Sequence, residues 1–178
     1  DTWSMLLFTT GTTGNSKGVV MYHKNDVAIA GNVMEGTQMK PGNVEIIPMP
    51  LNHSFGIRRY QSDMINGGTV CLMNGMALIG NLWKMLEQYH ATSMAISPAT
   101  LGMIFHLSGD RISEYADQID YIQVGSAPLP ETDKEKLLRY LPNTRLYNFY
   151  GSSEAGCSCI LEFSRQNKNC LLYTSPSP

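Results

Sequence analysis

The stretch Leu7-Phe8-Thr9-Thr10-Gly11-Thr12-Thr13-Gly14-Asn15-Ser16-Lys17-Gly18-Val19-Val20 places four threonines, three glycines and one lysine between two apolar runs. Glycine lets a backbone approach an anion closely, and successive backbone N–H groups in such a turn form a concave anion site. Threonine hydroxyls add donors, and Lys17 adds a mobile positive charge that suits phosphate. The same residue types also occur in ordinary turns. The density of hydroxyls beside a lysine nevertheless favours a phosphate-binding loop.

This loop differs from a Walker phosphate loop, which has the pattern G-x-x-x-x-G-K-[ST] and opens a helix. Lys17 follows Ser16 and precedes Gly18, and the next residues are the β-branched and apolar Val19-Val20-Met21-Tyr22. We therefore expect the loop to join one strand to another. The phosphates would then be held by Lys17 and the hydroxyls, without a helix dipole behind them.

The segment from Phe8 to Val19 resembles the phosphate loop of the adenylate-forming superfamily of acyl- and aryl-CoA ligases, luciferases and peptide-synthetase adenylation domains. The pattern of that superfamily is roughly [YF]-T-[ST]-G-[ST]-T-G-x-P-K-G-V, and Ser16 stands here where proline is usual. The resemblance implies a metal contact for Thr9 and a catalytic role for Lys17 at the leaving pyrophosphate. It also implies that the nucleotide is bound by Thr9, Thr10, Gly11, Thr12, Thr13, Gly14 and Lys17.

Length, composition and net charge limit the classes of protein to which this chain can belong. The 178 residues allow one domain or a piece of a larger one, and 43% hydrophobic with 16% charged residues is typical of a foldable globular chain. A net charge of -2 gives no reason to expect nucleic acid or an anionic membrane as partner. No apolar run approaches the length of about 18 residues that indicates a transmembrane helix. The start at Asp1, without a secretory signal, suggests an excised or incomplete piece.

The four cysteines and four histidines do not form metal-binding patterns. Cys71, Cys157, Cys159 and Cys170 lack C-x-x-C spacing, and no H-x-x-x-H pair is present. We interpret the cysteines as free thiols in a reducing compartment and expect a cytoplasmic protein.

Apolar runs and helical spacings alternate along the rest of the chain. Strands are expected at 3–8, 19–23, 44–49, 69–73, 93–96, 121–124 and 145–149, and helices from a cap at Asn25 or Asp26 to about 39 and at 55–66, 81–90, 98–107 and 131–140. This alternation predicts an α/β fold, a mostly parallel sheet with helices on both faces. In such a sheet the binding crevice lies beyond the carboxyl ends of the strands.

The segment Pro50-Leu51-Asn52-His53-Ser54-Phe55-Gly56 follows a predicted strand and resembles the superfamily pattern P-[LM]-x-H-x-x-G. The resemblance places His53 and Phe55 at the mouth of the acyl pocket. A loop histidine before a helix start is the alternative. Amino-acid-activating relatives usually carry an aspartate near this point, whereas residues 52–55 offer no anion. A carboxylic acid without an α-amino group therefore fits better.

Two further segments follow predicted strands. Gly125-Ser126-Ala127-Pro128-Leu129 resembles the superfamily turn G-[AGS]-A-P-L, which implies that Gly125, Ser126 and Ala127 border the nucleotide and that Ser126 also borders the acyl channel. A plain small-residue turn that starts a helix is the alternative.

The segment from Tyr147 to Gly156 contains Tyr150-Gly151-Ser152-Ser153-Glu154 and resembles the motif Y-G-x-[ST]-E. The resemblance implies that Tyr150 stacks on adenine, that Asn148, Gly151 and Ser153 contact the nucleotide, and that Glu154 holds Mg²⁺ and serves catalysis. A carboxylate oxygen suits Mg²⁺. An ordinary turn with a solvated carboxylate is the alternative.

The resemblance implies an incomplete piece of the large N-terminal domain of an adenylate-forming enzyme. We expect a partial AMP-binding domain at 1–163 and a disordered or non-native tail at 164–178. The string Ser108-Gly109-Asp110 matches the ribose-binding S/T-G-D string but lies upstream of its usual place, so it is expected only to end a helix. The ribose aspartate, the hinge and the C-terminal domain with its catalytic lysine are expected to be missing.

The activity that the resemblance implies is ATP-dependent, Mg²⁺-dependent formation of an acyl-adenylate from a small carboxylic acid. The acyl group would then pass to the thiol of coenzyme A or a carrier protein. We expect this chain alone to be inactive. Two alternatives remain, a non-catalytic nucleotide- or phosphate-binding module and a peptide-synthetase-type amino-acid adenylation domain.

Overall fold

The computed structural model describes residues 2–9, 15–73, 75 and 79–165. The first elements along the chain are β1 (Trp3–Thr9), β2 (Lys17–Tyr22), α1 (His23–Gly36), β3 (Val44–Ile47), α2 (Ser54–Ile65), β4 (Thr69–Leu72) and α3 (Ile79–Tyr89). They are followed by β5 (Ser93–Ile96), α4 (Pro98–Ser108), the 3₁₀ helix η1 (Arg111–Tyr115), β6 (Tyr121–Val124), α5 (Glu131–Tyr140), β7 (Arg145–Ser152) and β8 (Gly156–Glu162).

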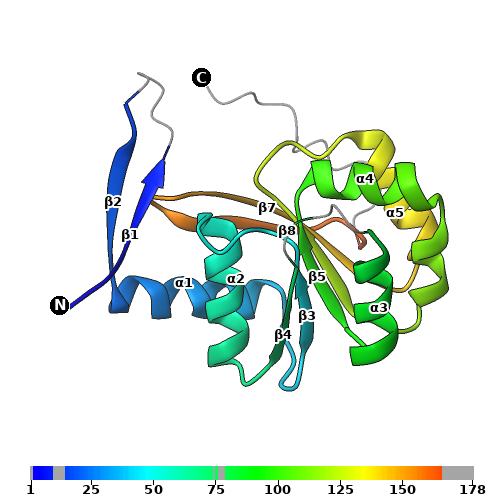
Figure 1. Cartoon of the computed structure of the whole chain (residues 1–178), viewed down its shortest axis with the longest axis horizontal. Coiled ribbons are helices and arrows are strands. Elements are labelled where there is room, and N and C mark those ends of the chain that lie inside the picture. The colour runs from blue at the N-terminus through cyan, green and yellow to red at the C-terminus, as the bar shows by residue number, and fades with distance from the viewer. Residues whose placement is uncertain (1, 10–14, 74, 76–78, 166–178) are drawn as a thin grey trace.

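The centre of the molecule is a six-stranded sheet in the order β4-β3-β5-β6-β7-β8. The pairs from β4 to β7 are parallel, and β8 is antiparallel to β7. Helices α1 and α2 cover one face, and α3, α4 and α5 cover the other (Figure 1). The predicted α/β fold with helices on both faces is therefore confirmed.

Successive side chains of a strand point to opposite faces of the sheet, so the central strands contribute to a different buried region on each face. Ile46, Met94 and Ile122 are fully buried in an apolar core that includes Leu82 and Leu86 of α3. Their sequence neighbours Glu45, Ser93 and Tyr121 are also fully buried but lie in a polar network beneath α2.

Most predicted elements are present, but the predicted start of one helix is wrong and one strand was not predicted. Helix α1 begins at His23 and ends at Gly36, so neither Asn25 nor Asp26 is its N-cap. Instead Asn25 Oδ1 accepts a hydrogen bond from the N-cap Tyr22 N at 3.2 Å. Strand β7 also extends to Ser152 and pairs with β8, which the sequence did not predict. Strand β8 has few buried side chains, so it lacks the apolar run or strict alternation that marks a strand.

Two other expectations concern the Ser-Gly-Asp string and the C-terminal tail. Helix α4 ends at Ser108, and Gly109 adopts a left-handed φ of 59° directly before η1, so the Ser-Gly-Asp string ends a helix as predicted. In the tail, Ser164 Oγ accepts a hydrogen bond from Leu146 N at 3.1 Å. Residues 166–178 lie outside the described residues, so most of the predicted tail stays a prediction.

Strands β1 and β2 form a separate antiparallel hairpin in which Thr9 is paired with Lys17. Ser16 Oγ donates to Thr9 O at 3.0 Å next to the loop. The predicted strand-loop-strand arrangement is therefore confirmed, although Thr10, Gly11, Thr12, Thr13 and Gly14 lie outside the described residues.

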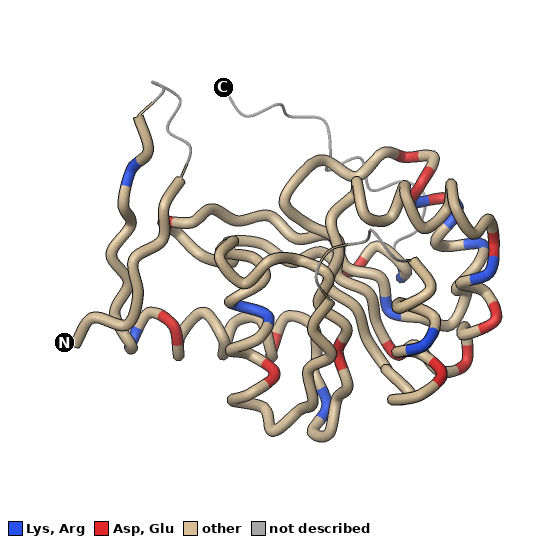
Figure 2. Tube along the Cα trace, viewed as in Figure 1, with Lys and Arg blue, Asp and Glu red and all other residues tan. Residues whose placement is uncertain are grey.

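One face of this hairpin packs on the rest of the molecule, where Leu7 and Met21 join Ile29 and Val33 of α1. The opposite face is apolar and open, with Trp3, Leu6 and Phe8 exposed by 70%, 51% and 67%. Figure 2 shows many charged residues around α3 to α5 and few on the hairpin. An exposed face of this kind is unfavourable in water.

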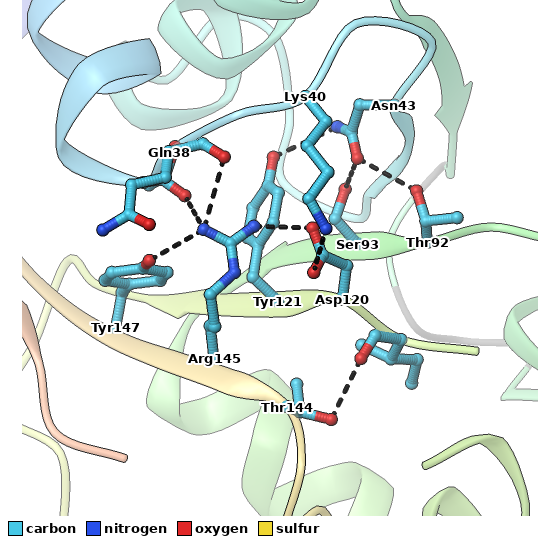
Figure 3. Close-up of polar contacts among 12 residues, drawn as sticks. Gln38, Lys40, Asn43, Thr92, Ser93, Asp120, Tyr121, Thr144, Arg145 and Tyr147 are labelled. Atoms are coloured by element: carbon cyan, nitrogen blue, oxygen red, sulfur yellow. Dashed lines mark hydrogen bonds and ion pairs between the residues drawn. The ribbon is translucent and has the colours of Figure 1, made fainter. Parts of the chain in front are cut away.

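A charged cluster fixes the loop after α1 to the amino ends of β6 and β7 (Figure 3). Arg145 Nη1 donates to Thr37 O at 2.6 Å, and Arg145 Nη2 is paired with Asp120 Oδ2 at 2.5 Å. Lys40 Nζ approaches Asp120 Oδ1 at 3.0 Å. This cluster therefore lies at the amino ends of the strands, away from their carboxyl ends, where the binding crevice is expected.

Beneath α2 one guanidinium is buried with two carboxylates. Arg59 Nε donates to Glu45 Oε1 at 2.7 Å, Arg59 Nη2 also binds Glu45, and Tyr121 Oη donates to Glu45 Oε2 at 2.6 Å. Burial is the largest single effect and opposes the charge of Arg59, but Glu45, Tyr121 and Asp63 together outweigh it and raise the pKa of Arg59. Asp63 receives a hydrogen bond from Asn43 Nδ2 at 2.9 Å. Burial, with the charge of Glu45, raises the pKa of Asp63 to about 7.

This raised pKa predicts that Asp63 destabilises the fold at high pH. Between the unfolded pKa of about 4 and the folded value, the folded state binds more protons, so stability falls as pH rises through this window. Asp63→Asn removes the charge and keeps an acceptor for Asn43. We expect the variant to gain on the order of 2 kcal/mol relative to the unsubstituted chain between pH 5 and pH 8. Urea unfolding at both pH values measures the gain, with the exposed Asp117→Asn as control. A gain that is equal at both pH values would contradict the assignment.

Candidate functional site

Three chain segments meet beyond the carboxyl ends of β3, β6 and β7. They enclose a cleft of about 160 Å³. Its walls are formed by His53, Ser54, Phe55, Arg58, Ser126, Phe149, Gly151, Ser152 and Ser153. The structure therefore brings together five residues that the sequence selected from three separate segments: His53, Phe55, Ser126, Gly151 and Ser153.

His53 is the N-cap of α2. Its Nδ1 accepts a hydrogen bond from Phe55 N at 3.2 Å, which holds the imidazole ring at the end of the helix. The other ring nitrogen, Nε2, takes no part in this cap. The side chain is exposed at the cleft. His53 thus has a structural part as a helix cap, and it also presents a polar ring to any molecule in the cleft.

The floor of the cleft is aromatic. Phe55 is only 3% exposed and stacks on Phe149 with ring centroids 5.0 Å apart and an interplanar angle of 9°. A Cβ atom on Gly125 would lie 2.5 Å from Phe149 Cδ1, and one on Gly151 would lie 2.9 Å from Phe149 Cζ and 2.1 Å from Gly156 O. Both motif glycines are therefore needed for the Phe149 ring to occupy this position.

Ser126 occupies a backbone conformation that non-glycine residues seldom adopt, with φ of 76°. Such a left-handed residue costs on the order of 1–3 kcal/mol and persists only where the surrounding structure holds it. Ser126 is also exposed at the cleft, directly after the carboxyl end of β6. Strain of this kind is typical of residues that a functional site holds in place.

Helix α2 is joined to the β7–β8 turn by polar contacts across the cleft. Arg58 Nη1 donates to Ser152 O at 2.7 Å and Arg58 Nη2 donates to Ser153 O at 2.6 Å, while Ser153 Oγ and Ser54 Oγ are 3.3 Å apart. Within the turn, Ser152 Oγ accepts from Ala155 N at 3.1 Å. Burial lowers the pKa of Arg58, and the negative charges of Asp26 and Glu154 act against that shift.

Several sequence-selected residues do not line the cleft. Tyr150 is 65% exposed, which leaves its ring free for stacking, and Glu154 is exposed in the turn after β7. The others are Gly125, Ala127 and Asn148, and on the hairpin Thr9 and Lys17. The hairpin is a neighbour of this turn, because Cys157 of β8 packs against the cluster of Leu7 and Met21.

Glu154 is a single exposed carboxylate in the turn after β7, and a carboxylate oxygen is a ligand type that suits Mg²⁺. Among the described residues no group of three His, Cys, Asp or Glu side chains could hold a metal ion. Mg²⁺ does not need such a group, since it usually binds one or two carboxylates together with substrate phosphates and water. Cys71, Cys157 and Cys159 are unpaired, and Cys170 lies outside the described residues.

The sequence did not select Arg58, Phe149, Ser54 or Ser152 as functional residues. Ser54, Phe149 and Ser152 lie inside quoted motifs, so their place next to selected residues was the available signal. Arg58 carries no such signal, because an arginine in an amphipathic helix usually points to solvent, whereas this one is only 5% exposed.

Comparison with known proteins bears directly on the family. The sequence model described as "AMP-binding enzyme" matches residues 1–175 of this chain. The chain belongs to the AMP-binding enzyme family. The resemblance to adenylate-forming enzymes that the motifs carry is thereby confirmed.

Curated relatives of this AMP-binding chain are named as CoA ligases. 4-Coumarate–CoA ligase 3 of Arabidopsis thaliana is 27% identical over 173 residues, which are 93% of this chain and 30% of the relative. The peroxisomal OPC-8:0-CoA ligase 1 of the same plant is 24% identical over 158 residues, 87% of this chain and 29% of the relative. The chain thus spans about a third of the length of these relatives.

Solved structures show the same AMP-binding fold. The o-succinylbenzoate CoA synthetase MenE of Bacillus subtilis, in complex with the acyl-adenylate intermediate OSB-AMP, has a TM-score of 0.77 at 21% identity, over 88% of this chain and 31% of that one. VinN in complex with L-aspartate has a TM-score of 0.75 at 22% identity, over 90% and 40% of the two chains. In the described part of the AMP-binding chain, no helix has the length and apolar character needed to cross a membrane.

Proposed function

We propose that the protein containing this chain activates a carboxylic acid with ATP and then forms a thioester. A carboxylate oxygen of the acid would attack the α-phosphorus of ATP, and the bond from that phosphorus to the pyrophosphate oxygen would break. The sulfur of a thiol, on either coenzyme A or a carrier protein, would next attack the acyl carbon, and the bond from that carbon to the phosphate oxygen would break and release AMP. The observation that carries this proposal is the cleft that unites His53, Ser126 and Ser153 within an AMP-binding chain.

The nucleotide would lie on the side of the β7–β8 turn. Tyr150 offers an exposed ring for adenine, and Asn148, Gly151 and Ser153 would contact the nucleotide together with Gly125, Ser126 and Ala127. Glu154 and Thr9 would hold Mg²⁺, which supplies positive charge at the phosphates when it is bound. Lys17 and the loop at 9–14 would bind the leaving pyrophosphate. Phosphoryl-type transfer depends mainly on such positioning and charge stabilisation.

The acid would lie on the side of α2, against His53, Phe55 and Ser126. The walls of the cleft contain one charged side chain, Arg58, and no carboxylate among the described residues that line it. An α-ammonium group would therefore meet no anion there. This favours fatty or aryl acids over amino acids, and it is consistent with relatives that are named CoA ligases.

The experiment is a survey of ATP–pyrophosphate exchange by the full-length protein with Mg²⁺ and a panel of fatty, aryl and α-amino acids. We expect fatty or aryl acids to give the highest kcat/KM. An α-amino acid as best substrate would support the peptide-synthetase alternative. Mg²⁺–ATP binding without exchange for any acid would support a non-catalytic module. The cytoplasmic location stays a prediction, and a fluorescent fusion imaged in the source cells tests it.

A further inference from the structure

We infer that Arg58 is a positioning residue, which holds the turn that carries Ser153 and Glu154 at a fixed place relative to the acid-binding end of α2. This inference rests on the proposed function. Arg58 Nη1 and Nη2 donate to two consecutive carbonyls, Ser152 O and Ser153 O, at 2.7 Å and 2.6 Å. Two short bonds from one planar guanidinium fix both the distance and the orientation of the peptide units that they hold.

The helix that carries this clamp also carries the acid side of the cleft. His53 caps the amino end of α2, and Phe55 stacks on Phe149 of β7. Arg58 follows Phe55 by less than one helical turn. A rigid α2 thus links the segment proposed to bind the acid to the segment proposed to bind the nucleotide. In-line attack needs the two reactants at a defined separation, and small misplacements strongly lower the rate.

The positive charge of Arg58 is buried, although the two backbone carbonyls that it binds are neutral groups. The side chain is 5% exposed, its Nε has no hydrogen-bond partner, and it forms no ion pair within the described parts of the chain. Burying a cation without a bonded anion is unfavourable. The negative charges that act on Arg58 from nearby are those of the buried Asp26, which has the larger effect, and of Glu154. A guanidinium in this place therefore holds the turn that carries the proposed Mg²⁺ ligand by two hydrogen bonds, and Asp26 offsets part of the cost of burying its charge.

Arg145 provides a matched control, because it makes the same kind of contact elsewhere. Arg145 Nη1 donates to Thr37 O at 2.6 Å and to Gln38 O at 3.3 Å, which are again two consecutive backbone carbonyls. It lies at the amino ends of β6 and β7, in the cluster drawn in Figure 3, whereas the cleft lies beyond the carboxyl ends of the strands. Loss of Arg145 should lower stability without a specific effect on nucleotide use.

The test compares Arg58→Met, Arg58→Lys and Arg145→Met in the full-length protein. Met keeps the length and apolar stem of the side chain, and Lys keeps the charge but can no longer form a planar two-point contact. Measured quantities are kcat and KM for Mg²⁺–ATP in ATP–pyrophosphate exchange, the Mg²⁺ concentration at half-maximal rate, and Tm. We expect Arg58→Met to lower kcat/KM for Mg²⁺–ATP by about 10–100-fold and to shift the Mg²⁺ dependence. Arg58→Lys should recover part of this loss, and Arg145→Met should lower Tm with kcat, KM and Mg²⁺ dependence unchanged.

A change in Tm alone for Arg58→Met, matching that of Arg145→Met, would overturn the inference. If Arg58→Met does not fold, Arg58→Lys decides, because unchanged kinetics and Mg²⁺ dependence in that variant would also overturn it. If the unsubstituted protein shows no exchange with any acid, the proposed function fails. Titration calorimetry of Mg²⁺–ATP with the same variants still tests Arg58, and equal affinities for Arg58→Met and the unsubstituted protein would then overturn its role.

Discussion

Assayed by itself, the 178-residue chain is expected to release no measurable pyrophosphate in the presence of ATP, Mg²⁺ and a carboxylic acid. The chain covers only 28–31% of the first relatives it matches. The resemblance to adenylate-forming enzymes implies that a ribose-binding aspartate and a catalytic lysine come from segments that this chain does not contain. Loss of the ribose contact should weaken ATP by roughly 1.5–3 kcal/mol. Loss of one preorganised charge at the reacting phosphate lowers a rate by about 10²–10³.

A pyrophosphate-release assay on the purified chain measures this directly, with the same panel of acids as above. The full-length protein, assayed in parallel, shows that the substrates and conditions are suitable. Acid-dependent release by the chain alone at rates of order 1 s⁻¹, which is within the usual range of enzymes, would contradict the expectation. It would also mean that the cleft and the hairpin suffice for the chemistry.

The second large effect is expected from Glu154→Gln in the full-length protein. The amide keeps the size of the side chain but removes the negative charge, so the proposed Mg²⁺ contact weakens. The exposed position of Glu154 in the β7–β8 turn makes a general loss of stability a minor factor. We expect kcat for ATP–pyrophosphate exchange to fall by about 10²–10³, in the range typical of losing one electrostatic contact to the transition state.

Exchange rates measured over a range of Mg²⁺ concentrations distinguish a carboxylate that binds the metal from one that affects the rate without binding it. For Glu154→Gln the half-maximal rate should require more Mg²⁺ than for the unsubstituted protein. Glu135→Gln serves as control, because Glu135 is an exposed carboxylate on α5, and α5 covers the face of the sheet opposite to α1 and α2. Identical kcat and Mg²⁺ dependence in both variants would remove Glu154 from the proposed site.

Much of the fold was predictable where sequence signals were local. The strands at 93–96 and 121–124 and the helix at 131–140 have the predicted bounds, because each is a short apolar run or a periodic segment between turn residues. Strand β8 escaped prediction because its stability comes from pairing with β7, which no local pattern reveals. The start of α1 was misplaced because Asn25 accepts a bond from outside the helix while lying inside its first turn.

The site was predictable only in part, for a similar reason. Residues that follow the carboxyl ends of parallel strands meet at one edge of a sheet, which is why His53, Ser126 and Ser153 share a cleft. Arg58 acts on backbone carbonyls that lie 94 and 95 residues away in the sequence. A backbone carbonyl has no residue type, so no sequence pattern can mark it as the partner of a side chain.

The strand order has a consequence for how the chain can fold during its synthesis. From β6 to β8, each strand lies beside the strand that precedes it in the sequence, and β5 lies beside the earlier strand β3. A growing chain folds from its N-terminal side as it leaves the ribosome at about 5–20 residues per second. Each of these strands therefore emerges when its neighbour in the sheet is already available. One edge of the sheet is β4 and the other is at any moment the newest strand; β8, whose side chains at Ser158 and Cys159 face solvent, is the last to be added.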